Sequence, residues 1–340
     1  MVNWRWSSFD KGKMMKRIGA AALLGALAIA TRADADTAAL QDYPARPIRL
    51  IVPGVPGVPP DLAARAVSEH LASGLGKPVT VENRPGASGT IGLAEIAKAA
   101  PDGYTIGVLG MPYTVAPSLY PRLAYDTARD FAPVCQVLWS SQLLVVRASS
   151  PWRTLDDLVA AAKVNPGSLT FSSGQPGVPS HLVGEMLKLR ARIDIRAIPF
   201  KGSMEGLTAV MGGQVDFMFT PAGNALGPVK AGKLRPLATA TPARLAAYPD
   251  VPTMAELGHP GFDVRDWNGI VAPAGTPREI IARLAIEVRA AAADPAVKER
   301  LAALSMEAAS DSSPEKFGAL IRAELERWAK FVRESGIRAD

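Results

Sequence analysis

Two kinds of apolar segment alternate along most of this chain, and their spacing predicts strands separated by single helices. Short apolar runs predict strands, and apolar positions three or four residues apart predict helices. The expected strands are 47–53, 78–82, 104–109, 142–147, 168–172, 195–199, 215–219, 234–240 and 268–272. The expected helices are 60–75, 89–100, 154–164, 179–190, 204–212, 223–231, 277–293 and 314–334. This order predicts an α/β protein with mostly parallel sheets that helices cover on both faces.

Three loops rich in glycine, proline and serine join an expected strand to the helix that follows it. They lie at 53–61, 172–180 and 200–203. Such a loop directs free backbone N–H groups and the positive end of a helix dipole beyond the strand, where an anion can bind. Ligands of open α/β sheets bind at this end of the strands. The pattern therefore predicts an anion-binding site and gives no indication of catalysis.

The amino-terminal segment has the parts of a secretory signal peptide. A basic block precedes 13 apolar residues at 18–30, and an Ala-Asp-Ala sequence at 33–35 fits a signal-peptidase site. The apolar run is too short to span a bilayer. We therefore expect residues 1–35 to be a signal peptide that is cleaved near Ala35 on export to the periplasm. A buried helix or a membrane anchor is the alternative.

Removal of this segment changes the charge of the chain. The full sequence has 38 basic and 32 acidic residues, and 1–35 hold six and two of them, which leaves a net charge of +2. No run of Lys or Arg then remains to suggest a nucleic-acid partner. No later segment contains 18 uninterrupted apolar residues. Met15 also looks like a natural start, in which case residues 1–14 are an extension and not part of the protein.

The motifs of catalysis and metal binding do not occur in the sequence. It has no G-x-S-x-G, no P-loop and no strand-linked G-x-G-x-x-G, and its three histidines form no H-E-x-x-H. We therefore expect no cofactor, no metal and no enzyme activity. His181 could orient a base with Glu185, but a helix-start histidine with local hydrogen bonds is the favoured interpretation. Asp61 could pair with Asp216, but a helix cap is favoured. Cys135 is expected to be a buried thiol.

Several motifs occur in an order that is typical of one family. They include 81–89 (VENRPGASG), 199–203 (PFKGS), 212–216 (GGQVD) and 272–277 (APAGTP). Through them the chain resembles, over nearly all of 43–338, the Bug (Bordetella uptake gene) or TctC-like family. These are periplasmic solute receptors of tripartite tricarboxylate transporters.

The resemblance implies a two-lobed periplasmic-binding-protein fold (Venus flytrap, type II) with two hinge crossover strands. The crossovers are expected near 142–147 and 267–272. Lobe 1 would then consist of 43–142 plus 268–340, and lobe 2 of 143–267. The ligand would be a small organic carboxylate, which a monomeric receptor delivers to integral-membrane subunits of the transporter. A receptor that signals to a sensor kinase, or an enzyme on the same scaffold, is the alternative.

The resemblance also implies which residues hold the ligand between the lobes. Trp267 is as well explained by the core as by a wall of the cleft. The expected ligand-binding residues are Pro53, Gly54, Val55, Pro56, Gly57, Asp61, Ser172, Ser173, Gly177, Val178, His181, Gly202, Ser203, Thr220 and Trp267.

The sequence departs from the family pattern in these loops. The family's first loop commonly reads V-P-F-P-P-G-G-G-T-D, whereas here Gly54 replaces the aromatic residue and 58–60 read Val-Pro-Pro. Proline has no N–H to donate. In the second loop, Val178 occupies a position where Thr or Ser is common. Fewer donors and a more apolar lining favour a monocarboxylate with an apolar or aromatic body over a dicarboxylate.

Overall fold

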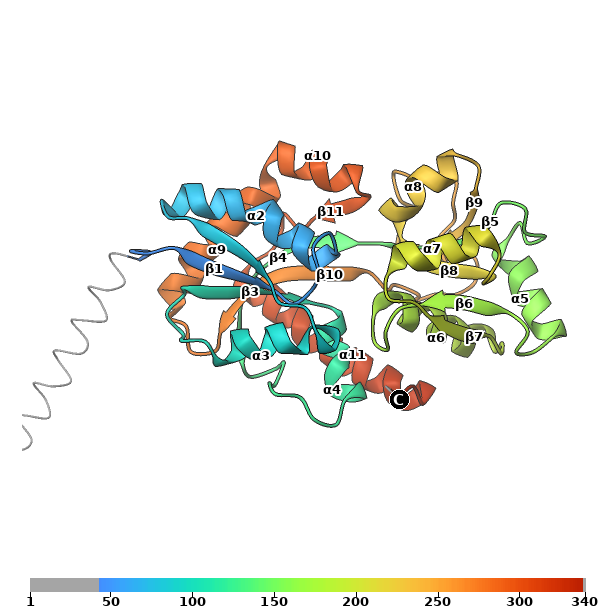
Figure 1. Cartoon of the computed structure of the whole chain (residues 1–340), viewed down its shortest axis with the longest axis horizontal. Coiled ribbons are helices and arrows are strands. Elements are labelled where there is room, and N and C mark those ends of the chain that lie inside the picture. The colour runs from blue at the N-terminus through green and yellow to red at the C-terminus, as the bar shows by residue number, and fades with distance from the viewer. Residues whose placement is uncertain (1–42, 339–340) are drawn as a thin grey trace, which may run out of the picture. The chain divides into compact units, whose positions relative to one another are not determined.

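A computed structural model describes residues 43–338 of the chain. The expected signal peptide and its cleavage site lie outside these residues. Residues 46–338 belong to one compact unit, in which two β-sheets with flanking helices form two lobes (Figure 1). Within the described part of the chain, no helix combines the length and the apolar character needed to cross a membrane.

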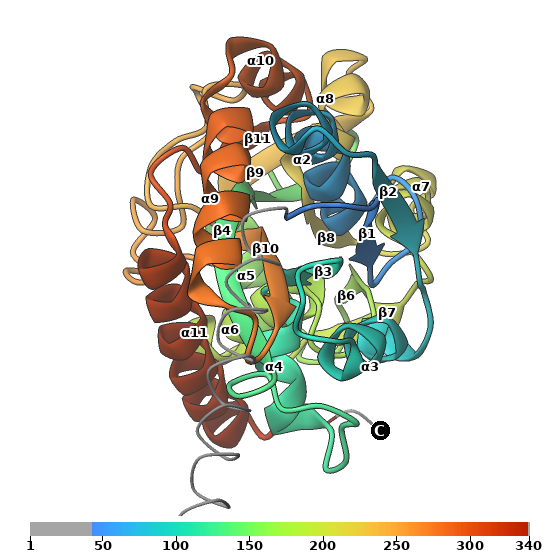
Figure 2. The same ribbon diagram turned by 90° about the vertical axis from the view of Figure 1, so that its left-hand side faces the viewer.

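The first lobe contains a six-stranded sheet. From edge to edge its strands are β11 (Met306–Ala308), β4 (Phe131–Ser140), β10 (Asp266–Pro273), β3 (Thr105–Gly110), β1 (Ile48–Val52) and β2 (Val79–Asn83). Helices cover both faces of this sheet (Figures 1 and 2). One face carries α2 (Pro59–Leu75) and α9 (Arg278–Ala293), and the other carries α3 (Thr90–Lys98), α4 (Pro112–Leu119) and α11 (Pro314–Ser335). A further helix, α10 (Pro295–Ala303), leads into β11.

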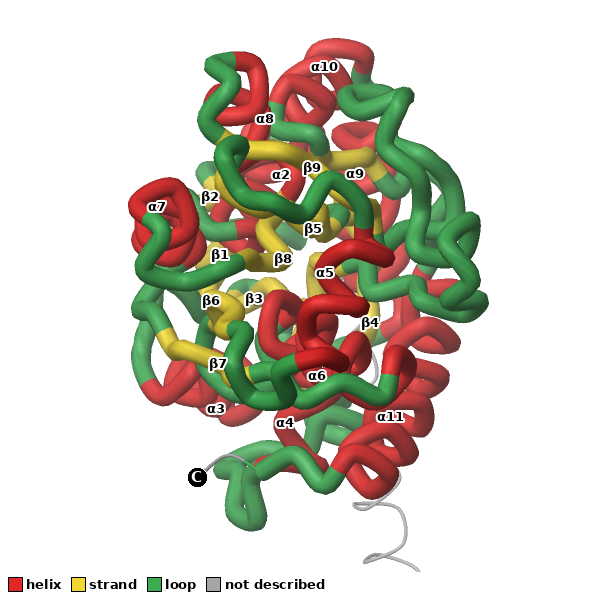
Figure 3. The backbone as a smooth tube through the Cα atoms, turned by 90° about the vertical axis from the view of Figure 1, so that its right-hand side faces the viewer, coloured by secondary structure: helices red, strands yellow, loops and turns green. Residues whose placement is uncertain are grey.

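The second lobe contains a five-stranded sheet. Its order is β7 (Arg196–Pro199), β6 (Thr170–Ser173), β8 (Phe217–Pro221), β5 (Gln142–Arg147) and β9 (Leu234–Thr239). Figure 3 shows α5 (Leu155–Val164) and α6 (Pro179–Ala191) on one side of it, and α7 (Ser203–Gly212) and α8 (Ala222–Lys230) on the other. Phe171 stacks on Phe217 in its core, with ring centroids 5.7 Å apart.

Both sheets are mixed, so the prediction of mostly parallel sheets is wrong. In the first sheet β10 runs antiparallel to β3 and β4. In the second sheet β5 runs antiparallel to β8 and β9. The chain passes from β4 into β5 through Ser141 and returns into β10 after β9. A strand that enters a lobe from its neighbour begins at the edge where the other strands end, and it must therefore run against them.

The expected strands and helices are all present, but the pattern missed two strands and two α-helices. These are β4, α4, α10 and β11. The most important omission is β4, whose apolar run contains Pro133 and Gln136 and lacks a clean alternation. Cys135 in this strand is buried as expected, and burial raises the pKa of its thiol to about 11. The expected apolar face of the last helix is also present, because Phe317, Ile321 and Trp328 of α11 are buried.

Candidate ligand-binding cleft

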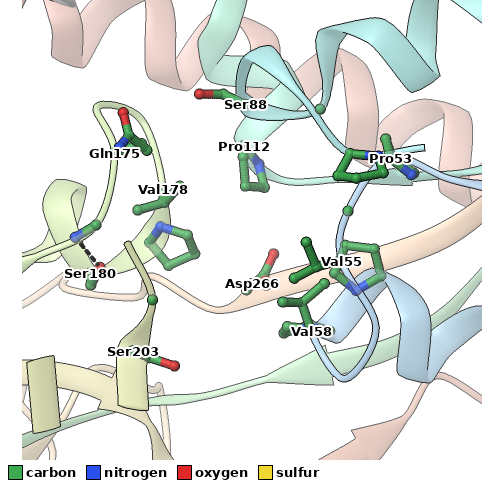
Figure 4. A pocket seen from close by; sticks show the side chains of 18 of the residues that line it. Pro53, Val55, Val58, Ser88, Pro112, Gln175, Val178, Ser180, Ser203 and Asp266 are labelled. Atoms are coloured by element: carbon green, nitrogen blue, oxygen red, sulfur yellow. Dashed lines mark hydrogen bonds between the residues drawn. The ribbon is translucent and has the colours of Figure 1, made fainter. Parts of the chain in front are cut away.

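A cavity of about 340 Å³ lies between the two lobes (Figure 4). Its walls come from strand-to-helix loops of both lobes and from the first residues of β5 and β10. The lining residues are Pro53, Gly54, Val55, Val58, Pro59, Pro60, Pro85, Gly86, Ser88, Gly89, Pro112, Tyr113, Gln142, Gly174, Gln175, Val178, Pro179, Ser180, Lys201, Gly202, Ser203, Pro221, Asp266 and Asn268. The volume suits a small organic molecule.

The structure divides the expected ligand-binding residues into two groups. Those that line the cavity are Pro53, Gly54, Val55, Val178, Gly202 and Ser203. Those outside its lining are Pro56, Gly57, Asp61, Ser172, Ser173, Gly177, His181, Thr220 and Trp267. Trp267 belongs to the core of the first lobe, where it packs edge-on against Phe317 at 5.4 Å between ring centroids. Asp61, Ser173 and His181 form hydrogen bonds with the loops of the cleft from behind its lining.

Asp61 stabilises the first loop through hydrogen bonds made inside the lobe. Only 2% of it is exposed, and its carboxylate accepts hydrogen bonds from Gly57 N–H at 2.9 Å and from Asn83 Nδ2 and Arg65 Nε at 3.0 Å. Burial alone would raise the pKa of Asp61, but these hydrogen bonds and the Arg65 charge together lower it. The carboxylate is therefore charged and fully engaged, and it acts on the ligand only by holding the loop.

His181, Ser173 and Thr220 of the second lobe also lie outside the lining of the cavity. Nδ1 of His181 accepts a hydrogen bond from the backbone N–H of Gly177, with the two nitrogens 3.4 Å apart. Burial lowers the pKa of the His181 ring. This arrangement is the local hydrogen bonding favoured above for His181. The Ser173 hydroxyl donates to the Gly174 carbonyl at 2.9 Å. Thr220 is fully buried in β8.

The amino end of α2 offers the cavity no free backbone N–H. The helix begins with Pro59 and Pro60, which have none, and the N–H groups of Asp61 and Leu62 both donate to the Val58 carbonyl. A helix amino terminus normally presents such donors to an anion. The two prolines therefore remove these donors from the start of α2.

The amino end of α7 in the second lobe differs from that of α2. The N–H groups of Ser203 and Met204 have no acceptor among residues 43–338. The adjoining Lys201 lines the cavity and forms no ion pair within this range. The Ser203 hydroxyl accepts a hydrogen bond from Asn224 Nδ2 at 2.8 Å, which holds it in place. This side of the cleft can therefore receive a carboxylate.

The floor of the cavity is formed by the two crossover strands. Gln142 opens β5, and Asp266 and Asn268 open β10. Figure 4 shows Asp266 between Val55 and Val58 of one lobe and Val178 and Ser203 of the other. Burial raises the pKa of Asp266 to about 7, and the nearby Asn268 amide opposes that rise only in part.

Sequence reasoning missed the floor and one further wall. That wall consists of Pro85, Gly86, Ser88 and Gly89 before α3, together with the start of α4. The 81–89 motif was a usable signal for it, because a run of Pro, Gly and Ser after a strand is the pattern that identified the other loops. The floor had no such signal, because its residues begin strands.

Gly89 allows this wall to approach Pro53 of the first loop closely. A Cβ at Gly89 would lie 2.3 Å from the Tyr113 hydroxyl and 2.7 Å from the Pro53 carbonyl oxygen. Tyr113 donates to that same carbonyl at 2.8 Å. We expect Gly89→Ala to break this contact and to lower the free energy of unfolding by roughly 1–3 kcal/mol more than the control described next.

Gly57→Ala is the matched control for this substitution. Gly57 has a similar left-handed backbone, φ +83° against +88° at Gly89, but a Cβ there meets nothing within 4 Å. Backbone strain is thus common to both variants, and only Gly89→Ala adds the clash. Urea unfolding of the two variants beside the wild type measures the difference. Equal losses of unfolding free energy in the two variants would mean that the Tyr113–Pro53 contact does not require a glycine at position 89.

The fold and the cleft define a two-lobed ligand-binding receptor. The model of the tripartite tricarboxylate transporter family receptor, TctC, matches residues 63–337, and the chain therefore belongs to this family. Among curated relatives, BugT of Bordetella pertussis is 38% identical over 314 residues, which cover 91% of this chain and 95% of that protein. The family and the two-lobed fold predicted from the sequence are thus confirmed.

Two solved structures resemble this one over nearly their whole length. R. palustris Rpa4515 with adipate has 31% identity and a TM-score of 0.79, covering 87% of this chain and 99% of its own. MatC from Rhodopseudomonas palustris with bound malate has 33% identity and a TM-score of 0.76, covering 85% and 100%. Both of these proteins hold a dicarboxylate.

Proposed function

We propose that this receptor captures a small organic monocarboxylate with an apolar or aromatic body in the cleft between its lobes. It then delivers the ligand to the integral-membrane subunits of a tripartite tricarboxylate-type transporter. The family supports the transport role, and the adipate and malate complexes support a carboxylate as the ligand. The proposal includes export to the periplasm with cleavage near Ala35, and action as a monomer without catalysis.

The observation that carries the preference for one carboxylate is the unequal supply of donors on the two sides of the cleft. The start of α7 and Lys201 can satisfy one carboxylate, whereas Pro59 and Pro60 leave the start of α2 without a free N–H. A second carboxylate against α2 would lose its water without gaining partners. An unsatisfied buried polar group costs roughly 1–3 kcal/mol, and a charged one costs more.

The lobe boundaries of the sequence analysis stay part of this proposal, with hinges in the two crossovers. The carboxylate would bridge the lobes from α7 toward the apolar residues of the first loop, such as Val55 and Val58. A ligand that contacts both lobes only when they are closed shifts the population toward closure.

The preference can be tested by calorimetry of ligand-free protein with matched mono- and dicarboxylates. We expect hexanoate and benzoate to bind more tightly than adipate and terephthalate by at least about tenfold, or 1.4 kcal/mol. Pro60→Thr supplies an N–H and a hydroxyl at the start of α2, and Val178→Thr supplies a hydroxyl across the cleft. Both changes should recover part of the dicarboxylate affinity.

Pro56→Thr is the control, because Pro56 lies in the same loop but does not line the cavity. It adds the same chemical groups where the ligand cannot use them, and it should leave the ratio of affinities unchanged. A wild-type protein that prefers the dicarboxylate of each pair by tenfold would overturn the proposed preference. Absence of any heat or thermal shift with a wide carboxylate panel would overturn the proposed function itself.

A further inference from the structure

Three buried polar side chains on the floor of the cleft have atoms without a hydrogen-bond partner. The exposed fractions of Gln142, Asp266 and Asn268 are 2%, 6% and 0%, and all three line the cavity. The unpartnered atoms are Oε1 of Gln142, Oδ1 of Asp266, and both Oδ1 and Nδ2 of Asn268. Three of these four atoms are oxygens that accept hydrogen bonds.

Such a cluster is costly unless something else completes it. Buried polar groups in native proteins are nearly always hydrogen-bonded, and an unpaired buried charge is the most unfavourable case. Asp266 forms no ion pair with any residue from 43 to 338. Among the unpartnered atoms on this floor only Nδ2 of Asn268 is a donor, so residues 43–338 supply at most one amide donor and no cation beside Asp266.

The charges around the cavity are few and of opposite sign. Among residues 43–338, only Lys201 and Asp266 line the cavity with a charged side chain. Lys201 adjoins the free N–H groups at the start of α7, whereas Asp266 opens β10. Most of the remaining lining is apolar side chain or glycine. A ligand that matches this distribution has an anionic end, an apolar body and a second end that donates hydrogen bonds and carries positive charge.

We propose that Asp266, with the side-chain oxygens of Gln142 and Asn268, forms a subsite for a cationic nitrogen on the ligand. The ligand class is then an amino-substituted carboxylate, whose carboxylate lies at the start of α7 and whose ammonium group lies on the cleft floor. This inference rests on the proposed function, because it takes one carboxylate at α7 as given. The inference specifies the chemical group at the end of the ligand that is remote from this carboxylate.

Three ligands with the same number of carbon atoms separate the two proposals. Hexanoate, 6-aminohexanoate and adipate differ only at the sixth carbon, which is a methyl group, a methylene that carries an ammonium group, or a second carboxylate. The five-carbon set of pentanoate, 5-aminopentanoate and glutarate tests the fit of length. In calorimetry we expect the amino acid of a set that fits to bind at least about tenfold more tightly than its methyl-ended counterpart, as for a buried charge-assisted hydrogen bond.

Asp266→Asn identifies the residue responsible. The substitution keeps the shape and removes the charge, so the affinity for the amino acid should fall by about tenfold or more while that for hexanoate changes little. Asp263→Asn is the matched control. Asp263 lies three residues earlier, pairs with Arg265 at 3.0 Å and does not line the cavity. It should leave all three affinities unchanged.

The outcomes of this experiment are distinguishable. Binding of hexanoate without any gain for 6-aminohexanoate or 5-aminopentanoate overturns the subsite and leaves the proposed function intact. A gain that persists in Asp266→Asn also overturns it, because the ammonium group would then be recognised elsewhere. Tighter binding of adipate than of hexanoate overturns both proposals, since the floor would be accepting a second carboxylate.

Discussion

Replacing Asp266 by Asn is expected to make the ligand-free protein more stable at pH 8 and to flatten its stability between pH 4 and pH 7. Burial raises the pKa of Asp266 from 3.8 to about 7. The folded state therefore binds a proton more tightly than the unfolded state. Stability from this group is complete below the unfolded pKa and is lost as pH rises through the folded pKa.

The size of this effect follows from the shift in pKa. Each unit corresponds to about 1.4 kcal/mol, so the wild type should lose on the order of 3–4 kcal/mol from this group across that range. Urea unfolding at pH 4, 6 and 8 measures it. The half-buried pair of Asp263 and Arg265 provides the control, because Asp263→Asn removes a carboxylate that has an ion-pair partner. Parallel pH profiles for the wild type and Asp266→Asn would mean that the charge is compensated within the fold.

Gly223→Ala is expected to weaken ligand binding by at least about tenfold, because the added methyl group keeps the two lobes from coming together around the ligand. A Cβ at Gly223, in α8 of the second lobe, would lie 2.1 Å from the backbone oxygen of Leu304, which follows α10 in the first lobe. Backbone atoms cannot rotate away as a side chain does. The clash is relieved most readily if the lobes separate, which disfavours the arrangement that encloses the cleft.

Gly227→Ala tests whether this effect is specific to the contact. Gly227 lies one turn later in the same helix, and a Cβ there meets nothing within 4 Å. It should leave the affinity near the wild-type value. Small-angle scattering should show a larger radius of gyration for ligand-free Gly223→Ala than for Gly227→Ala. Equal affinities and equal radii in the two variants would exclude a role for the Leu304 contact in closure.

Most of the secondary structure could be predicted because it depends on local spacing. Apolar residues at helical intervals, such as Phe317 and Ile321 in α11, identify a buried face without reference to the rest of the chain. The failures have local causes as well. Pro133 and Gln136 interrupt the alternation of β4, and α4 contains Pro117, so neither pattern matched a simple period.

The candidate site could be predicted only in part. Strand-to-helix loops indicate which end of a sheet binds a ligand, and Val55, Val178 and Gly202 do line the cavity. The loops do not indicate which of their residues face inward. Asp61 and His181 turned out to hold the loops from behind, because a polar side chain at a helix start satisfies nearby backbone groups as readily as a ligand.

The sequence by itself determined the properties that depend on covalent structure and local order. Pro59 and Pro60 remove N–H groups from the start of α2 in any fold, and the alternation of elements decides the α/β class. Only the tertiary structure decided that Gln142, Asp266 and Asn268 share the floor of one cleft. They meet because both crossover strands begin at the cleft and run against their neighbours. Strand direction depends on which partners a strand finds, and a period along the chain carries no information about that.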